Sequence, residues 1–130
     1  MYKLATISAL LIALGIIAGA FGAHALKDYF QGTQEEVWKT AVFYQLINSL
    51  GILVLFSITN SSLDLLARIK AASCLILAGV LIFSASLYLL VLTNIKWLGA
   101  ITPIGGSCLI IGWLMVTRAF WQFSRSSSKK

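Results

Sequence analysis

Seven side chains of this sequence carry an imidazole, an amide or a hydroxyl group within or beside long apolar runs. They are His24, Gln45, Asn48, Ser84, Ser86, Tyr88 and Thr102. Amides and hydroxyls both donate and accept hydrogen bonds. His24 is the only histidine, and an imidazole can exchange a proton near neutral pH. The chemistry open to this set is therefore hydrogen bonding, with proton exchange at a single position.

Patterns typical of enzymes and of metal or cofactor sites are missing from the sequence. A metal site needs several His, Cys or carboxylate ligands together, and the single histidine has no cysteine near it. Cys74 and Cys108 have no basic neighbour that would activate a thiol, and we do not expect them to form a disulfide. There is no nucleophile–base pair, glycine-rich phosphate loop or cofactor motif. We therefore predict no catalytic, cofactor-binding or metal-binding residue.

Four apolar runs must position these side chains: roughly residues 4–22, 40–58, 71–92 and 98–117, none of which contains a charged residue. About 20 helical residues cross a hydrocarbon layer of about 30 Å, so each run can span a membrane. Only 11% of the 130 residues are charged, whereas a soluble domain has about a quarter. The sequence predicts an all-α integral membrane four-helix bundle with helices at about 4–22, 34–58, 63–92 and 98–121. Residues 1–123 would form its single transmembrane domain, and residues 124–130 a polar basic tail.

The distribution of basic residues predicts the orientation of the bundle. With four spans, both termini and the second loop share one side, which holds seven of the ten Lys and Arg residues: Lys3, Arg68, Lys70, Arg118, Arg125, Lys129 and Lys130. Basic flanks stay in the cytoplasm, so we expect both termini there and the protein in the cytoplasmic (inner) membrane. The net charge of +6 is then a topology signal combined with attraction to anionic lipids. The basic residues are scattered, which argues against a nucleic-acid partner.

The first apolar run has a second interpretation, as a secretory signal cleaved at Ala23-His-Ala25. The apolar core of a signal peptide has about 7–15 residues, and residues 4–22 exceed that length. We therefore expect this run to be retained as a membrane helix.

Capping boxes and one short connection predict the helix boundaries. Residues 33–36 and 61–64 match the capping-box pattern, which places helix starts near Gln34 and Ser62. Residues 93–97 leave room only for a tight turn, so the third and fourth helices are expected to form an antiparallel hairpin.

Small residues in the first run predict close helix packing. Gly15, Gly19 and Ala23 recur every four residues on one face, and Gly22 widens the strip. Columns of small residues let helix backbones approach one another in lipid. This face is therefore expected to contact another helix.

Pro103, the only proline, lies just inside the fourth run, beside Thr102, Gly105 and Gly106. Proline lacks the amide that would bond to the carbonyl of Gly99, and its ring crowds that carbonyl. Either the helix is kinked or broken at Thr102–Pro103, or Thr102 caps a helix that starts at Pro103. From Pro103 to residue 118 a helix would rise only about 24 Å, which favours a kink or a break. Gly105 and Gly106 would then let another backbone come close.

The alternating directions of the helices place most of the polar side chains at one depth. His24, Gln45, Ser84, Ser86, Tyr88 and Thr102 fall in the outer half of the bilayer and Asn48 near its middle, and we call these seven the outer polar cluster. The inner half of each span is almost purely aliphatic. Two interpretations remain open: a hydrogen-bonded plug that fixes which helices pair, and a small outward-facing pocket.

Short motifs lie along all four predicted helices: Gly19–Lys27, Trp38–Ala41 with Tyr44–Gln45, Phe83–Tyr88, and Ile101–Gly106 followed by Gly112–Trp113. Through them the chain resembles the domain-of-unknown-function 423 family of small four-helix membrane proteins, which is related to the animal transmembrane protein 256. The resemblance implies the fold and the membrane location but supplies no reaction. Similar proteins tend to have histidine in place of Asn48 and glycine in place of Ala85. The absence of histidine at position 48 argues against a mechanism that pairs His24 with a second histidine.

These patterns predict a multi-pass membrane protein that is not an enzyme. It would act by helix-face contacts with membrane lipids, with further copies of itself in a homo-oligomer, or with a larger membrane complex. The alternative is a small permease or a solute- or lipid-binding protein that uses the outer polar cluster as a pocket. The four runs contain no carboxylate, which argues against a proton- or sodium-coupled carrier.

Overall fold

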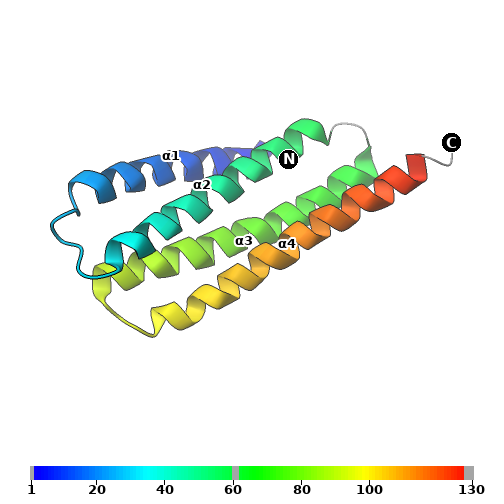
Figure 1. Cartoon of the computed structure of the whole chain (residues 1–130). Helices are drawn as coiled ribbons and strands as arrows, with labels where there is room; N and C mark the ends of the chain where they lie inside the picture. The colour runs from blue at the N-terminus through cyan, green and yellow to red at the C-terminus, as the bar shows by residue number, and fades with distance from the viewer. Residues whose placement is uncertain (1, 60–61, 128–130) are drawn as a thin grey trace.

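The computed structural model describes residues 2–59 and 62–127. Over these residues the chain forms four antiparallel α-helices, α1 (Tyr2–His24), α2 (Gln34–Ile58), α3 (Leu63–Thr93) and α4 (Leu98–Ser127) (Figure 1). Each helix is long and apolar enough to cross a membrane. The start of α1 and the end of α4 lie at the same end of the bundle. The predicted all-α four-helix membrane architecture is confirmed.

The helices pack in chain order. α1 packs against α2, α2 against α3, and α3 against α4, while α1 approaches α3 at only a few positions. Within the described residues α1 and α4 make no close backbone contact. α1 and α4 are therefore the edge helices of the bundle, and each leaves a broad face uncovered.

The centre of the bundle is formed mainly by α3 and the second half of α2. Ile52, Ile69, Ile76 and Val80 are fully buried there, and α1 adds Leu11 to the same apolar core. Burial of such side chains against other helices, rather than intrinsic propensity, supplies most of the stability of a helix in a folded protein. α3 is thus the scaffold against which both neighbouring helices are positioned.

The capping box predicted at residues 33–36 does not form. α2 does begin at Gln34, but the Thr33 side chain makes no capping hydrogen bond. Thr33 has φ −88° and ψ 5° instead of the extended backbone of an N-cap, so its hydroxyl does not face the free amides. The Gln34 side chain instead accepts a hydrogen bond from the Gln31 amide at 2.9 Å.

α3 begins at Leu63, close to the start predicted near Ser62. Ser62 is the N-cap, and its Oγ accepts a hydrogen bond from the Leu65 amide at 3.1 Å. Ser61, the predicted cap, lies outside the described residues. Asp64 forms an ion pair with Arg68 at 2.9 Å, because side chains four residues apart on a helix are neighbours.

The tight connection between α3 and α4 is confirmed. Asn94 ends α3 in the left-handed region at φ 58°, and its amide donates to the Leu90 carbonyl at 2.9 Å. Asparagine adopts this conformation more readily than other residues with a side chain. α4 then begins at Leu98, so the two helices form an antiparallel hairpin.

α4 is continuous through Pro103. A break at Thr102–Pro103 and a helix start at Pro103 are therefore both wrong, whereas a kink stays a prediction. Pro103 lies in the second turn, where few residues precede it and only the carbonyl of Gly99 loses its usual amide partner. At its other end α4 continues through Ser127, past the expected end near residue 121, so residues 124–127 of the predicted tail are helical.

Two glycines of α1 lie directly against α2. A Cβ on Gly15 would be 2.7 Å from Leu46 Cδ2, and a Cβ on Gly22 would collide with the indole of Trp38. Both glycines are buried. This face of α1 is therefore occupied within the chain, and it is not free for a partner.

Gly19 and Ala23 lie at the edge of the same contact. A Cβ on Gly19 would be 3.5 Å from Val42, which is ordinary contact, and Ala23 is exposed. An α-helix has 3.6 residues per turn, so the side chains that follow Gly15 at intervals of four drift away from α2.

The contact between α3 and α4 depends on Gly105. A Cβ there would lie 2.5 Å from the backbone nitrogen of Phe83, whereas a Cβ on Gly106 would be 3.8 Å from the Phe83 ring. Gly105 is buried and Gly106 is partly exposed. The two helices approach so closely at Gly105 that no side chain fits between them.

Candidate functional site

Gln45 connects three helices by hydrogen bonds at both ends of its amide. Its Nε2 donates to the Leu11 carbonyl of α1 at 2.7 Å, and its Oε1 accepts from the Tyr88 hydroxyl of α3 at 2.9 Å. The side chain is only 6% exposed. A polar group in an apolar surrounding must find partners to offset its lost hydration, and here both ends find them inside the protein.

Two further hydrogen bonds join the same helices at nearby levels. The Ser84 hydroxyl donates to the Ala41 carbonyl at 2.9 Å, which links α3 to α2. The Trp38 indole donates to the Ala18 carbonyl of α1 at 2.9 Å, and its ring lies 4.7 Å from the Tyr88 ring between centroids. These contacts fix the register of α2 against both α1 and α3.

A second group of contacts reaches α4. Asn48 donates from Nδ2 to the Tyr44 carbonyl at 2.8 Å and accepts at Oδ1 from the Trp113 indole at 2.7 Å. The hydroxyls of Ser86 and Thr102 lie 2.8 Å apart and share a hydrogen bond between α3 and α4. Asn48 thus links α2 to α4, although these helices do not pack directly by backbone contact.

His24 is not brought to the rest of the outer polar cluster. It is the last residue of α1 and is exposed, and its imidazole has no hydrogen-bond partner among residues 2–59 and 62–127. Two residues of α-helix turn the chain by roughly 200°. Because Gly22 faces α2, His24 is directed away from it.

The structure divides the remaining six residues into separate contacts. Gln45 and Tyr88 bond to each other, as do Ser86 and Thr102, whereas Ser84 and Asn48 each bond to backbone carbonyls of α2. Every one of these six side chains is engaged within the protein.

Sequence reasoning missed Trp113. Its indole N–H donates the hydrogen bond to Oδ1 of Asn48, and the residue type was the available signal, because a partly buried indole N–H usually finds an acceptor.

Sequence reasoning also missed three serines, Ser8, Ser49 and Ser73, which are fully buried. Their hydroxyls have no hydrogen-bond partner in the described parts of the chain. They lie toward the end of the bundle that holds the start of α1 and the end of α4, so that half of the bundle is not purely aliphatic, and their small size suits close helix contacts.

A groove of about 300 Å³ lies between α1 and α3, with Gln45, Ser84 and Tyr88 among its lining residues. Leu11, Leu14 and Val80 supply part of its apolar wall. The sequence predicted that the outer polar cluster, which includes Thr102, could form a pocket. Thr102 does not line this groove, because its hydroxyl is turned to Ser86 between α3 and α4.

Charged groups lie at the helix ends. Lys39 pairs with Glu35 at 2.7 Å in the first turns of α2, and Arg68 with Asp64 at the start of α3. Within residues 2–59 and 62–127 no three His, Cys, Asp or Glu side chains lie close enough to hold a metal ion. The bundle interior thus offers hydrogen bonds between helices, and the charges are available at its two ends.

Comparison with known proteins identifies relatives over most of the chain. The model of a family described as "Protein of unknown function (DUF423)" matches residues 18–106. A UPF0382 membrane protein of Staphylococcus aureus is 41% identical over 111 residues, which is 85% of this chain and 88% of the relative. The UPF0382 membrane protein YwdK of Bacillus subtilis is 41% identical over 109 residues, 84% of this chain and 86% of the relative. No solved structure matches the chain.

Proposed function

We propose that this chain, which belongs to the DUF423 family of proteins of unknown function and is a multi-pass membrane protein, acts without catalysing a reaction. In this proposal it works through contacts of its helix faces with membrane lipids or with the other members of a larger membrane complex. Its site of action is then the exterior of the bundle.

The uncovered face of α1 is the observation that carries this proposal. α1 buries a narrow stripe consisting of Ser8, Leu11, Gly15 and Gly22. Large apolar side chains along the rest of the helix are exposed, and they include Ile7, Leu10, Leu14, Ile17 and Phe21. These five recur at intervals of three and four residues, which places them along one side of the helix. An edge helix with such a face can receive an acyl chain or another membrane helix.

The interior polar groups support the same proposal. Gln45 and Asn48, the two side-chain amides within the four apolar runs, use both their donor and their acceptor ends in hydrogen bonds. Buried polar groups that are fully paired specify how helices fit together. We therefore assign these residues a structural role and look for the function outside.

We further propose that both termini face the cytoplasm in the cytoplasmic (inner) membrane. The two ends lie on one side of the bundle, and seven of the ten Lys and Arg residues belong to that side. Basic residues close to membrane helices are retained on the cytoplasmic side. The α1–α2 and α3–α4 connections then face outward.

Photo-crosslinking tests the proposed function. A photoreactive amino acid replaces Ile17 on the exposed face of α1, and in a control variant it replaces Ile110, which is exposed on α4 to a similar extent (63% and 64%). We expect position 17 to give a product of defined mass, a lipid or a protein, that position 110 does not give. The same unselective mixture of lipid adducts at both positions would contradict the proposal.

A second candidate function is a small permease or a solute- or lipid-binding protein that uses the groove between α1 and α3. It is favoured by Gln45, Ser84 and Tyr88, which line that groove. Ala85 also lines it, and a cysteine there should react with an impermeant thiol reagent added outside if the groove is hydrated. Complete protection of Ala85→Cys would contradict this candidate.

A further inference from the structure

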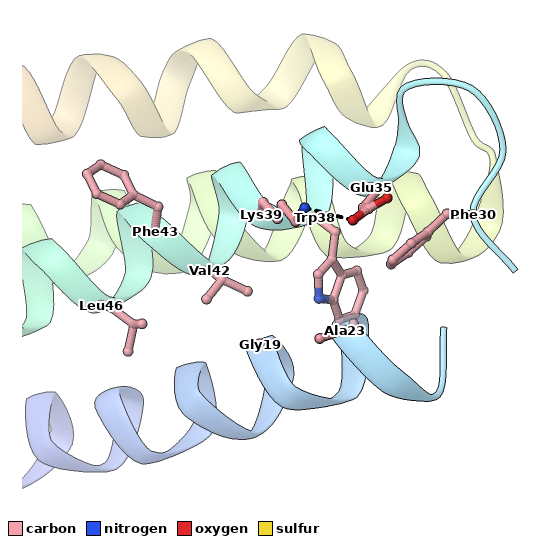
Figure 2. Close-up of a pocket in the computed structure, with 10 residues that line it drawn as sticks. Gly19, Ala23, Phe30, Glu35, Trp38, Lys39, Val42, Phe43 and Leu46 are labelled. Atoms are coloured by element: carbon pink, nitrogen blue, oxygen red, sulfur yellow. Dashed lines mark ion pairs between the residues drawn. The ribbon is translucent and has the colours of Figure 1, made fainter. Parts of the chain in front are cut away.

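A second groove runs between α1 and the first half of α2, at the end of the bundle where the α1–α2 connection lies (Figure 2). Gly19 and Ala23 form its floor on α1. Val42 and Leu46 point toward α1 from the other side, and Phe30 approaches from the connection. The volume is about 250 Å³. Pockets that enclose a whole drug-sized ligand measure roughly 300–1,000 Å³, so this groove suits a segment of a chain.

Trp38 holds the groove open. Its indole lies over Gly22, where a Cβ would collide with it, and donates to the Ala18 carbonyl at 2.9 Å. The width of one indole therefore separates α1 from α2 at this level. One helical turn before Gly22, Gly19 has no side chain to fill the space between the two helices. A Cβ there would lie 3.5 Å from Val42, which is ordinary contact. An apolar slot remains beside the indole.

A charge pair lies at the rim of this slot. Lys39 Nζ and Glu35 Oε1 are 2.7 Å apart, and the two side chains are 70% and 49% exposed (Figure 2). Exposed pairs of this kind stabilise a helix only weakly, so either partner can turn to a ligand of opposite charge. The pair stands immediately before the apolar run of α2 begins at residue 40, which is the level of the lipid headgroups.

From this arrangement we propose that the groove binds a phosphatidylethanolamine-type phospholipid. One acyl chain lies along the groove over Gly19, Ala23 and Val42, the phosphate contacts Lys39, and the primary ammonium contacts Glu35. Among the residues that line the groove there is one cation beside one anion, which complements a zwitterionic headgroup better than a purely anionic one. The inference rests on the proposed function, because it names one lipid with which the helix faces would make contact.

Lipid binding to the purified full chain tests the inference. The protein in a mild detergent is titrated with dioleoylphosphatidylethanolamine, and bound lipid is counted by native mass spectrometry. The matching phosphatidylcholine and phosphatidylglycerol are titrated in parallel. Phosphatidylcholine has a methylated ammonium that cannot donate a hydrogen bond to Glu35, so we expect phosphatidylethanolamine to bind most tightly.

Two substitutions and two matched controls locate the site. Gly19→Leu fills the slot and Lys39→Gln removes the cation, and each should weaken phosphatidylethanolamine binding by roughly tenfold, equivalent to about 1.4 kcal/mol. Ala20→Leu on the exposed side of α1 and Lys96→Gln in the other connection at the same end should leave it unchanged. Lys39 is exposed, so its variant remains informative if Gly19→Leu folds poorly.

Failure of the lipid inference and failure of the proposed function give different results. Tighter binding of phosphatidylglycerol, or equal phosphatidylethanolamine binding by Gly19→Leu and the wild type, would overturn the inference and leave the proposed function standing. A wild-type protein that holds neither lipid nor protein partner would contradict the proposed function and the inference together.

Discussion

Tyr88 donates its hydroxyl hydrogen to Oε1 of Gln45 at 2.9 Å, and this bond joins α3 to α2 inside the membrane-spanning part of the bundle. The same amide donates from its other end to the Leu11 carbonyl of α1. One side chain therefore links three helices. This is the behaviour expected of a plug, in which polar groups specify helix pairing.

Tyr88→Phe should destabilise the bundle by about 0.6–2 kcal/mol, the range found for hydrogen bonds between membrane helices. It leaves Oε1 of Gln45 without its donor. Tyr44→Phe is the matched control, because the Tyr44 hydroxyl has no hydrogen bond to the described residues. Reversible unfolding in mixed detergent micelles measures both variants. Equal losses at the two positions would show that the Tyr88–Gln45 bond contributes nothing.

Gly105→Ala should destabilise the contact between α3 and α4, whereas Gly106→Ala should not. The new methyl at position 105 would lie 2.5 Å from the Phe83 backbone nitrogen, but the one at 106 would lie 3.8 Å from the Phe83 ring. Overpacking of this kind costs about 1–3 kcal/mol, while alanine at an unstrained helical position gains up to about 1 kcal/mol over glycine. Thermal unfolding followed by circular dichroism should show opposite shifts, and equal shifts would contradict the observed contact.

The number of spans and the hairpin at residues 93–97 could be predicted because they depend on one-dimensional properties. The length of an apolar run decides whether it can cross a membrane, and a five-residue gap leaves no alternative to a tight turn. The capping box at residues 33–36 failed for a different reason. The pattern at Thr33 is correct in its letters, but the cap requires an extended backbone that Thr33 does not adopt.

The outer polar cluster was predicted from the depth of its residues in the bilayer. Depth does not determine the direction in which a side chain leaves its helix. His24 and Tyr88 fall at similar levels, but His24 is directed away from α2 while Tyr88 reaches Gln45. The register that decides this depends on Trp38 packed over Gly22, a contact between residues sixteen positions apart. No property of either residue alone predicts that contact, so the partners of the amides could not be assigned from the sequence.

Asn48→Leu should destabilise the protein by about 1–3 kcal/mol, because the Trp113 indole N–H would lose its acceptor in an apolar surrounding. The double variant Asn48→Leu with Trp113→Phe should recover much of this loss, since replacing both partners by apolar groups is nearly neutral. Unfolding in detergent gives the coupling free energy between the two positions. Strictly additive losses would contradict a direct bond.

Asn48→His tests whether another hydrogen-bond acceptor at position 48 can replace the amide oxygen. The Nδ1 atom of histidine stands as far from the backbone as the Oδ1 atom of asparagine, and a neutral imidazole nitrogen accepts a hydrogen bond. This variant should therefore retain more stability than Asn48→Leu. Equal losses in the two variants would mean that the acceptor at position 48 has no part in holding α4.

The proposed orientation can be measured with single cysteines in a background where Cys74 and Cys108 are replaced by serine. Gln31→Cys and Lys96→Cys lie in the two connections expected outside, and Arg125→Cys lies in the last turn of α4, on the basic side. In intact cells an impermeant maleimide should label positions 31 and 96, and position 125 only after permeabilisation. The reverse pattern would place the seven basic residues outside, against the charge rule, and would put the Glu35–Lys39 pair at the cytoplasmic surface. The lipid groove would then draw from the inner leaflet, so the same experiment also decides which leaflet supplies the lipid proposed for the slot at Gly19.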